Sequence, residues 1–169
     1  MILCGAYGKI KDVTVLFNEI DQLSKQNNVI IQIVNADVIF GKDHIVSAYY
    51  HTNRCFENNT NSLDDKSLEF LLYLSGERQI SKAIKKVGIT NQVNTFAIII
   101  IPLQKENDCE SILAHIVSQF NFVKDDAILA GDKTTLKRFG ISEKEISTVP
   151  EENYADIILE KVALVDIIK

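Results

Sequence analysis

The order of hydrophobic and polar positions predicts strands alternating with helices along the first third of the chain. Residues 2–8 and 29–34 are short apolar runs, as strands are. Between them, Asp12 is a candidate N-cap, and apolar residues then recur at helical spacing over residues 13–23. After a short apolar piece that ends at Gly41, the pattern predicts a second helix over residues 43–57.

Two helices separated by a glycine are predicted in the middle of the chain. The first follows an Asn-rich loop, has Ser62 as its predicted N-cap, and is apolar on nearly every face over residues 68–74. Ser75 and Gly76 interrupt it. The second helix has Gly88 just past its end, and four apolar residues at helical spacing predict its inward side. These four are Ile80, Ala83, Ile84 and Val87.

The second half of the chain contains the clearest strand. Residues 95–101 form a continuous apolar run closed by Pro102, which predicts a central strand buried on both faces. We further expect helices over residues 108–120, 133–139 and 151–168, a short strand over 127–130, and a capping box at Ser142 and Glu145. The whole pattern predicts an α/β fold: a single domain over residues 1–169, with a small mixed β-sheet packed against several helices.

The distribution of charge restricts the surfaces that can bind nucleic acid. The 169 residues have a net charge of −5 at neutral pH. Residues 1–105 carry 11 Lys and Arg against 10 Asp and Glu, whereas residues 106–169 carry 7 against 13. Because attraction to phosphate needs positive potential, general polyanion binding is excluded, and we expect any nucleic-acid surface in the first two-thirds of the chain.

The cysteines and the longest apolar runs predict a cytoplasmic protein without a membrane segment. Cys4, Cys55 and Cys109 are far apart and odd in number, which argues against a disulfide framework or a zinc site. The N-terminus becomes polar too early for a signal peptide, and no apolar run approaches the length of a membrane span.

Few residues are candidates for catalysis. His44 and His51 lie two helical turns apart, and Cys55 lies one turn after His51, but no pattern supplies an oxyanion hole. The segment 131–134 lacks the glycines of a phosphate-binding loop. We therefore expect no catalytic residue, metal or cofactor, and an enzyme built on these two histidines and the cysteine is the least favoured alternative.

A local basic segment stands out against the acidic chain. Arg78, Lys82 and Lys86 have i, i+4, i+8 spacing, and Glu77 is the only acidic residue in residues 76–88. The free N–H groups of a helix that starts after Gly76 would add a natural anion site. The segment can be a phosphate-contacting face or a solvated helix surface, and both interpretations stay open.

The last helix is apolar over more than the ~100° arc that a surface helix buries. Either it is fully buried or part of it meets a partner, and the pattern does not decide between these. The apolar residues are Ile157, Ile158, Leu159, Val162, Ala163, Leu164, Val165, Ile167 and Ile168.

Two segments carry a family resemblance. Residues 69–89, EFLLYLSGERQISKAIKKVGI, and residues 162–166, VALVD, resemble the motifs of the kinase-associated small subunit of the KEOPS complex. Residues 34–36, Gly41 and His44 also lie where that family has a strand, a glycine and a helix with a histidine.

The resemblance implies a non-catalytic subunit of a heteromeric complex. Such a subunit binds the small atypical kinase-like ATPase of KEOPS and helps recruit tRNA through its 3′ CCA end, for threonylcarbamoyl modification of the adenosine next to the anticodon. The alternative is a purely protein-binding regulator of the kinase with no RNA contact. The predicted tRNA-binding residues are Gly76, Arg78, Gln79, Lys82 and Lys86, extended by Arg54 and Lys66. The predicted kinase-binding residues are Ile158, Val162, Val165 and Ile168.

Overall fold

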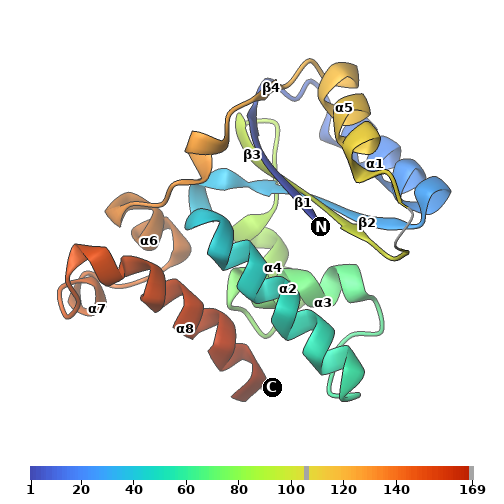
Figure 1. Ribbon diagram of the computed structural model, residues 1–169. Helices are drawn as coiled ribbons and strands as arrows, with labels where there is room; N and C mark the ends of the chain where they lie inside the picture. Colours follow the sequence, from blue (N-terminus) through green and yellow to red (C-terminus); the bar gives the residue numbers. More distant parts are fainter. Residues whose placement is uncertain (105–106, 168–169) are drawn as a thin grey trace. The chain divides into compact units, whose positions relative to one another are not determined.

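The computed structural model describes residues 1–104 and 107–167 (Figure 1). The chain forms two compact units, each built from two segments. The sheet unit comprises Met1–Ala36 and Ile89–Ile128, and the helical unit comprises Asp37–Gly88 and the chain from Leu129 onward. The single domain expected over residues 1–169 stays a prediction.

In its described residues, the sheet unit contains four strands in the order β2-β3-β1-β4. Their bounds are β1 Ile2–Tyr7, β2 Val29–Asn35, β3 Thr95–Pro102 and β4 Val123–Lys124. All pairings between described strands are antiparallel, so the small sheet packed against helices is confirmed, but it is not mixed. The reason is that β3 inserts between β1 and β2, which run in the same direction but do not pair, as in a split βαβ unit.

Two helices, α1 (Val13–Asn27) and α5 (Cys109–Gln119), cover one face of this sheet (Figure 1). Asp12 caps α1 as predicted, since its carboxylate accepts the N–H groups of Thr14 and Val15. The shared core includes alternate residues of β3, whose run from Phe96 to Ile101 is buried throughout. The prediction of a fully buried strand at this position is confirmed.

The predicted strand over 127–130 is wrong. Asp126–Leu129 forms a 3-10 helix, η2, and the short strand of this region is β4, just before it. Asp125 accepts the Ala127 N–H at 3.0 Å, and Asp126 accepts the Gly5 N–H at 2.9 Å. These side-chain bonds favour a turn over an extended backbone.

The helical unit contains six α-helices in the described residues and no strand. They are α2 (Gly41–Glu57), α3 (Lys66–Ser75), α4 (Ile80–Val87), α6 (Lys133–Phe139), α7 (Glu143–Ile146) and α8 (Tyr154–Ile167). Short 3-10 segments lie at Ala36–Val38 and Glu151–Asn153. Helix α8 lies alongside α2 and also contacts α3 and α6 (Figure 1). None of the described helices has the length and apolarity to span a membrane.

The N-cap of α3 differs from the prediction. Asp65, not Ser62, accepts the N–H groups of Ser67 and Leu68. The N–H groups of Ser62 and Leu63 instead donate to the buried carboxylate of Glu69, at 3.1 and 2.9 Å. This long side-chain contact holds the preceding segment as a loop, so the helix starts later than its local pattern suggests.

Most helix ends within residues 76–88 and 133–145 lie where the sequence pattern predicts them. Gly76 and Gly140 have positive φ, 65° and 101°. Gly76 ends α3 as predicted, and Gly140 ends α6. The capping box of Ser142 and Glu145 is also confirmed. Helix α4, however, begins at Ile80 rather than directly after Gly76, and Ile84 is half exposed instead of facing inward.

Candidate functional site

The turn between α3 and α4 is formed by Gly76–Gln79. Gly76 N–H donates to Tyr73 O and Glu77 N–H donates to Leu72 O, both at 3.1 Å, which closes α3 with a Schellman-type turn. A Cβ atom at Gly76 would lie 3.4 Å from both the Phe139 ring and the Lys161 side chain. These would be ordinary contacts, so it is the positive φ that favours glycine here.

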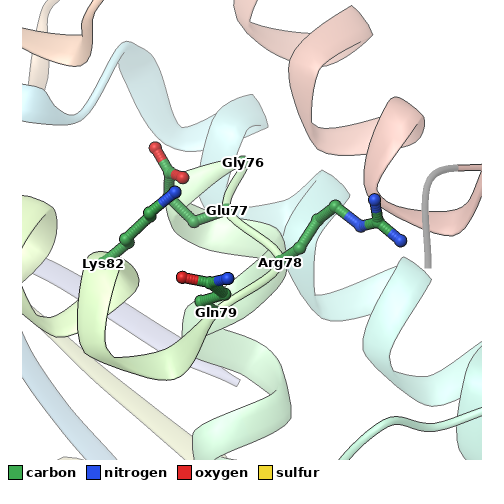
Figure 2. A pocket seen from close by; sticks show the side chains of 5 residues that line it. All are labelled: Gly76, Glu77, Arg78, Gln79 and Lys82. Carbon is green, nitrogen blue, oxygen red and sulfur yellow. The ribbon is translucent and has the colours of Figure 1, made fainter.

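A pocket of about 270 Å³ lies on this turn and is lined by Gly76, Glu77, Arg78, Gln79 and Lys82. We call it the turn pocket. Figure 2 shows the Glu77 and Lys82 side chains on one side, Arg78 extending to the other, and Gln79 between them. Within the described residues, Arg78 and Lys82 form no ion pair and both are exposed. Two available cations and an amide thus surround a hollow at a helix start.

Lys86 does not share this exposed surface. Its Nζ atom lies 3.1 Å from Glu77 Oε1 and 3.8 Å from the centroid of the buried Phe139 ring, and only 17% of its side chain is exposed. Burial lowers the pKa of Lys86, against the opposing effect of Glu77. The three cations therefore do not form one exposed helix face, because Arg78 precedes α4 and Lys86 lies against Phe139, although Lys82 and Lys86 line a common pocket. Contact of these residues with RNA stays a prediction.

His44 hydrogen-bonds to the C-terminal end of α3, just before the turn. It is 1% exposed, and its Nε2 atom lies 2.8 Å from Leu74 O, while Nδ1 accepts the Phe40 N–H at 3.2 Å. These partners assign the proton to Nε2. Burial lowers the pKa of His44 to about 4, so the ring is neutral at pH 7. Its edge contacts the Phe139 ring, with centroids 5.4 Å apart.

A second polar group, which we call the Asp166 cluster, fixes the end of α8. The Asp166 carboxylate accepts hydrogen bonds from His51 Nδ1 at 2.9 Å, from the Tyr73 hydroxyl and from the Arg54 guanidinium. The His51 ring stacks on Tyr73 with centroids 5.5 Å apart. Burial works to raise the pKa of Asp166, but these hydrogen bonds outweigh it and the pKa is lowered.

Arg54 and Lys66, which were predicted to extend the basic surface, do not line the turn pocket. Arg54 binds Asp166 and borders a separate hollow with Tyr50 and Glu57. Lys66, in the first turn of α3, has its Nζ atom 5.8 Å from the centroid of the Phe56 ring. An RNA contact at either residue stays a prediction.

The residues predicted to contact the kinase lie mostly in the core. Ile158, Val162 and Val165 are 0% exposed, and Ile168 lies outside the described residues. For the three described side chains, the buried alternative of the sequence analysis holds, because α8 packs them against neighbouring helices. Ile167, in contrast, is 76% exposed.

The candidate catalytic residues have separate structural partners. The Cys55 thiol is 2% exposed and donates to Thr52 O at 3.1 Å, with Glu69 Oε1 at 3.6 Å. His51 faces Asp166, and His44 faces Leu74. In residues 1–104 and 107–167, no three His, Cys, Asp or Glu side chains are grouped as a metal site requires.

A further hollow beside the turn pocket was not predicted from the sequence. A pocket of about 420 Å³, which we call the second pocket, shares Glu77 and Lys82 with the turn pocket. Its other lining residues are Lys85, Lys86, Arg138, Phe139 and Gly140. Arg138 belongs to α6, and the only local signal was a basic pair at the end of a helix, which is also what a helix dipole favours.

Comparison of the sequence with known protein families identifies the family of this chain. The sequence matches a class of kinase-binding proteins. The chain belongs to the family described as Kinase binding protein CGI-121, which it matches over residues 8–166. This match confirms the family resemblance of residues 69–89 and 162–166. No individual curated protein matches the chain.

Proposed function

We propose that the chain is a non-catalytic subunit of a KEOPS complex, which binds the kinase-like ATPase and helps recruit tRNA through its 3′ CCA end. The tRNA is recruited for threonylcarbamoyl modification of the adenosine next to the anticodon. The observation that carries the proposal is the match to a kinase-binding family over residues 8–166, which includes both motif segments. Buried positions of all three cysteines agree with a cytoplasmic, reducing location.

The turn pocket supports the RNA part of this proposal. A single-stranded 3′ end offers phosphates to cations and unstacked bases to hydrogen-bonding groups. Arg78 and Lys82 supply exposed positive charge, and the Gln79 amide can donate to and accept from a base edge. The net charge of −5 means that this attraction is local, so binding is modest and sensitive to salt.

Two exposed side chains next to the Asp166 cluster support the kinase part of the proposal. The side chains of Ile167 on α8 and Tyr50 on α2 are 76% and 66% exposed, although both are large and apolar. Ile167 follows Asp166 in α8, and Tyr50 precedes His51 in α2. The hydrogen bond between Asp166 and His51 joins these two helices. We assign the kinase contact to the surface around Ile167 and Tyr50, with the buried Val162 and Val165 holding α8 in place.

The test uses the purified chain with and without the kinase, and tRNA with and without its CCA end. We expect the kinase to co-purify with the chain, and intact tRNA to bind at least about tenfold more tightly than truncated tRNA, since a factor of ten is only ~1.4 kcal/mol. Absence of binding to either tRNA, with the kinase still bound, would favour the purely protein-binding regulator, and equal binding of the two tRNAs would contradict recruitment through the CCA end. Loss of kinase binding by the wild-type chain would contradict the proposal as a whole.

A further inference from the structure

The second pocket continues the basic surface of the turn pocket onto another helix. The two pockets share Glu77 and Lys82, so Lys82 stands between them. The second pocket then extends over Lys85, near the end of α4, to Arg138 of α6. Residues more than fifty positions apart in the sequence thus line one hollow beside the proposed RNA end site.

The charges of this pocket leave a net positive surface. Lys86 and Glu77 neutralise one another at 3.1 Å. Lys85 is exposed and forms no ion pair within the described residues, as is also the case for Lys82. Arg138 lies 3.1 Å from Asp37, but both side chains are about half exposed, and such pairs contribute only ~0–1 kcal/mol. A phosphate can therefore compete for this guanidinium.

The other cations of α6 differ from Arg138. Lys133 and Lys137 both contact Glu143 of α7, and neither lines the second pocket. Complementing the helix dipole can explain basic residues at a helix end, but it does not require them to border a common hollow with another helix. The helix dipole alone therefore does not account for the position of Arg138 on this pocket.

We propose that the second pocket binds the backbone phosphates of the RNA strand that leads to the CCA end, through Lys82, Lys85 and Arg138. This inference rests on the proposed function, since the turn pocket must hold the end of the strand. A single strand in a positively charged groove is bound mainly by its phosphates, without regard to sequence. The pocket would thus add affinity for the preceding nucleotides and no base preference.

The experiment compares two RNA probes, the trinucleotide CCA and a longer single strand that ends in CCA. Lys85→Gln with Arg138→Gln removes two of the proposed phosphate contacts and leaves the turn pocket intact. Lys133→Gln with Lys144→Gln removes the same charge from the same unit, at residues that line neither pocket. Fluorescence anisotropy over a salt series measures each affinity, and circular dichroism verifies folding.

The first double variant should weaken binding of the longer strand by on the order of tenfold near 0.1 M salt, and reduce the salt slope by about 1.4, which is ~0.7 for each lost contact. Its affinity for CCA should change less than about twofold, and the control should bind both probes like the wild type. The inference is overturned if both probes weaken equally, if neither weakens, or if the control has the same effect.

Two further outcomes separate this inference from the proposed function. If the wild-type chain binds neither probe, the proposed RNA function fails and this inference fails with it. If the wild type binds CCA, and the Lys85 and Arg138 variant keeps its affinity for the longer strand but loses the kinase, the second pocket is a protein surface. That result overturns the phosphate site while leaving the RNA end site standing.

Discussion

Lys86 Nζ lies 3.1 Å from Glu77 Oε1, so a residue of α4 binds the turn that precedes its own helix. The same ammonium lies over the Phe139 ring of α6. Lys86 therefore connects the turn pocket to the core of the helical unit. Its role, in our account, is to position the turn and not to contact phosphate.

Replacement of Lys86 by Met tests this role. We expect Lys86→Met to lower the free energy of unfolding by about 1–2 kcal/mol, because a largely desolvated cation–π contact and an ion pair are lost. RNA affinity should fall while the salt slope stays at the wild-type value. Lys82→Met should instead reduce that slope by about 0.7. Equal slope changes for the two variants would make Lys86 a phosphate contact.

The Asp166 cluster should contribute measurably to stability. Asp166→Asn weakens the acceptor for Tyr73, His51 and Arg54, and we expect a loss of about 1–3 kcal/mol in urea unfolding. Asp156→Asn, at an exposed position of the same helix, is the control and should change stability by less than about 0.5 kcal/mol.

The pH dependence of Asp166 has a definite sign. Its folded pKa is lowered, so its contribution is present above the unfolded value near 4 and is lost as the pH falls through the folded pKa. Asp166→Asn should therefore flatten the acid limb of the stability curve. An acid limb identical to that of the wild type would contradict the assignment.

The lowered pKa of His44 predicts a second effect of pH on stability, at higher pH than the effect of Asp166. Its folded pKa is about 4, below the unfolded value near 6.5, so the unfolded chain binds the proton first as the pH falls. Stability should rise with pH between about 4 and 6.5, by roughly 3 kcal/mol from this residue. His44→Gln should remove that rise, whereas His115→Gln, at a half-exposed site, should keep it. A rise that persists in His44→Gln would contradict the prediction.

Helix α8 allows the core and the proposed kinase surface to be separated. Val165→Arg places a charge in a fully buried position and should unfold the helical unit or cost more than about 3 kcal/mol. Ile167→Arg changes an exposed side chain and should leave the melting temperature nearly unchanged. We expect the Ile167 variant to stay folded and lose the kinase in co-purification. A folded Ile167 variant that still retains the kinase would place the interface elsewhere.

The elements that were predicted correctly depend on short-range physics. The apolar run of β3, the N-cap of α1 and the capping box at Ser142 involve residues within a few positions of one another. Gly76 was also identified, because a positive φ at a helix end favours glycine wherever it occurs. Local patterns therefore gave most of the helix and strand positions.

The errors have long-range causes. Glu69, within α3, accepts the N–H groups of Ser62 and Leu63 and holds them in a loop. Asp65 is therefore the N-cap, and the helix begins at Lys66. Lys86 does not lie on the exposed basic face that was predicted, because it packs against Phe139, more than fifty residues later in the sequence. The second pocket was missed for the same reason, since Arg138 reaches it only in the folded helical unit. No spacing rule within residues 76–88 contains this information.

The central claim is that the turn pocket binds the 3′ end of tRNA, and one titration tests it most directly. Intact tRNA and tRNA lacking CCA are titrated against the wild-type complex and against the complex with Arg78→Glu and Lys82→Glu. We predict that the wild type prefers intact tRNA, and that the double variant loses this preference while it retains the kinase, because both exposed cations of the pocket are reversed. A double variant that still binds intact tRNA as the wild type does would contradict the account.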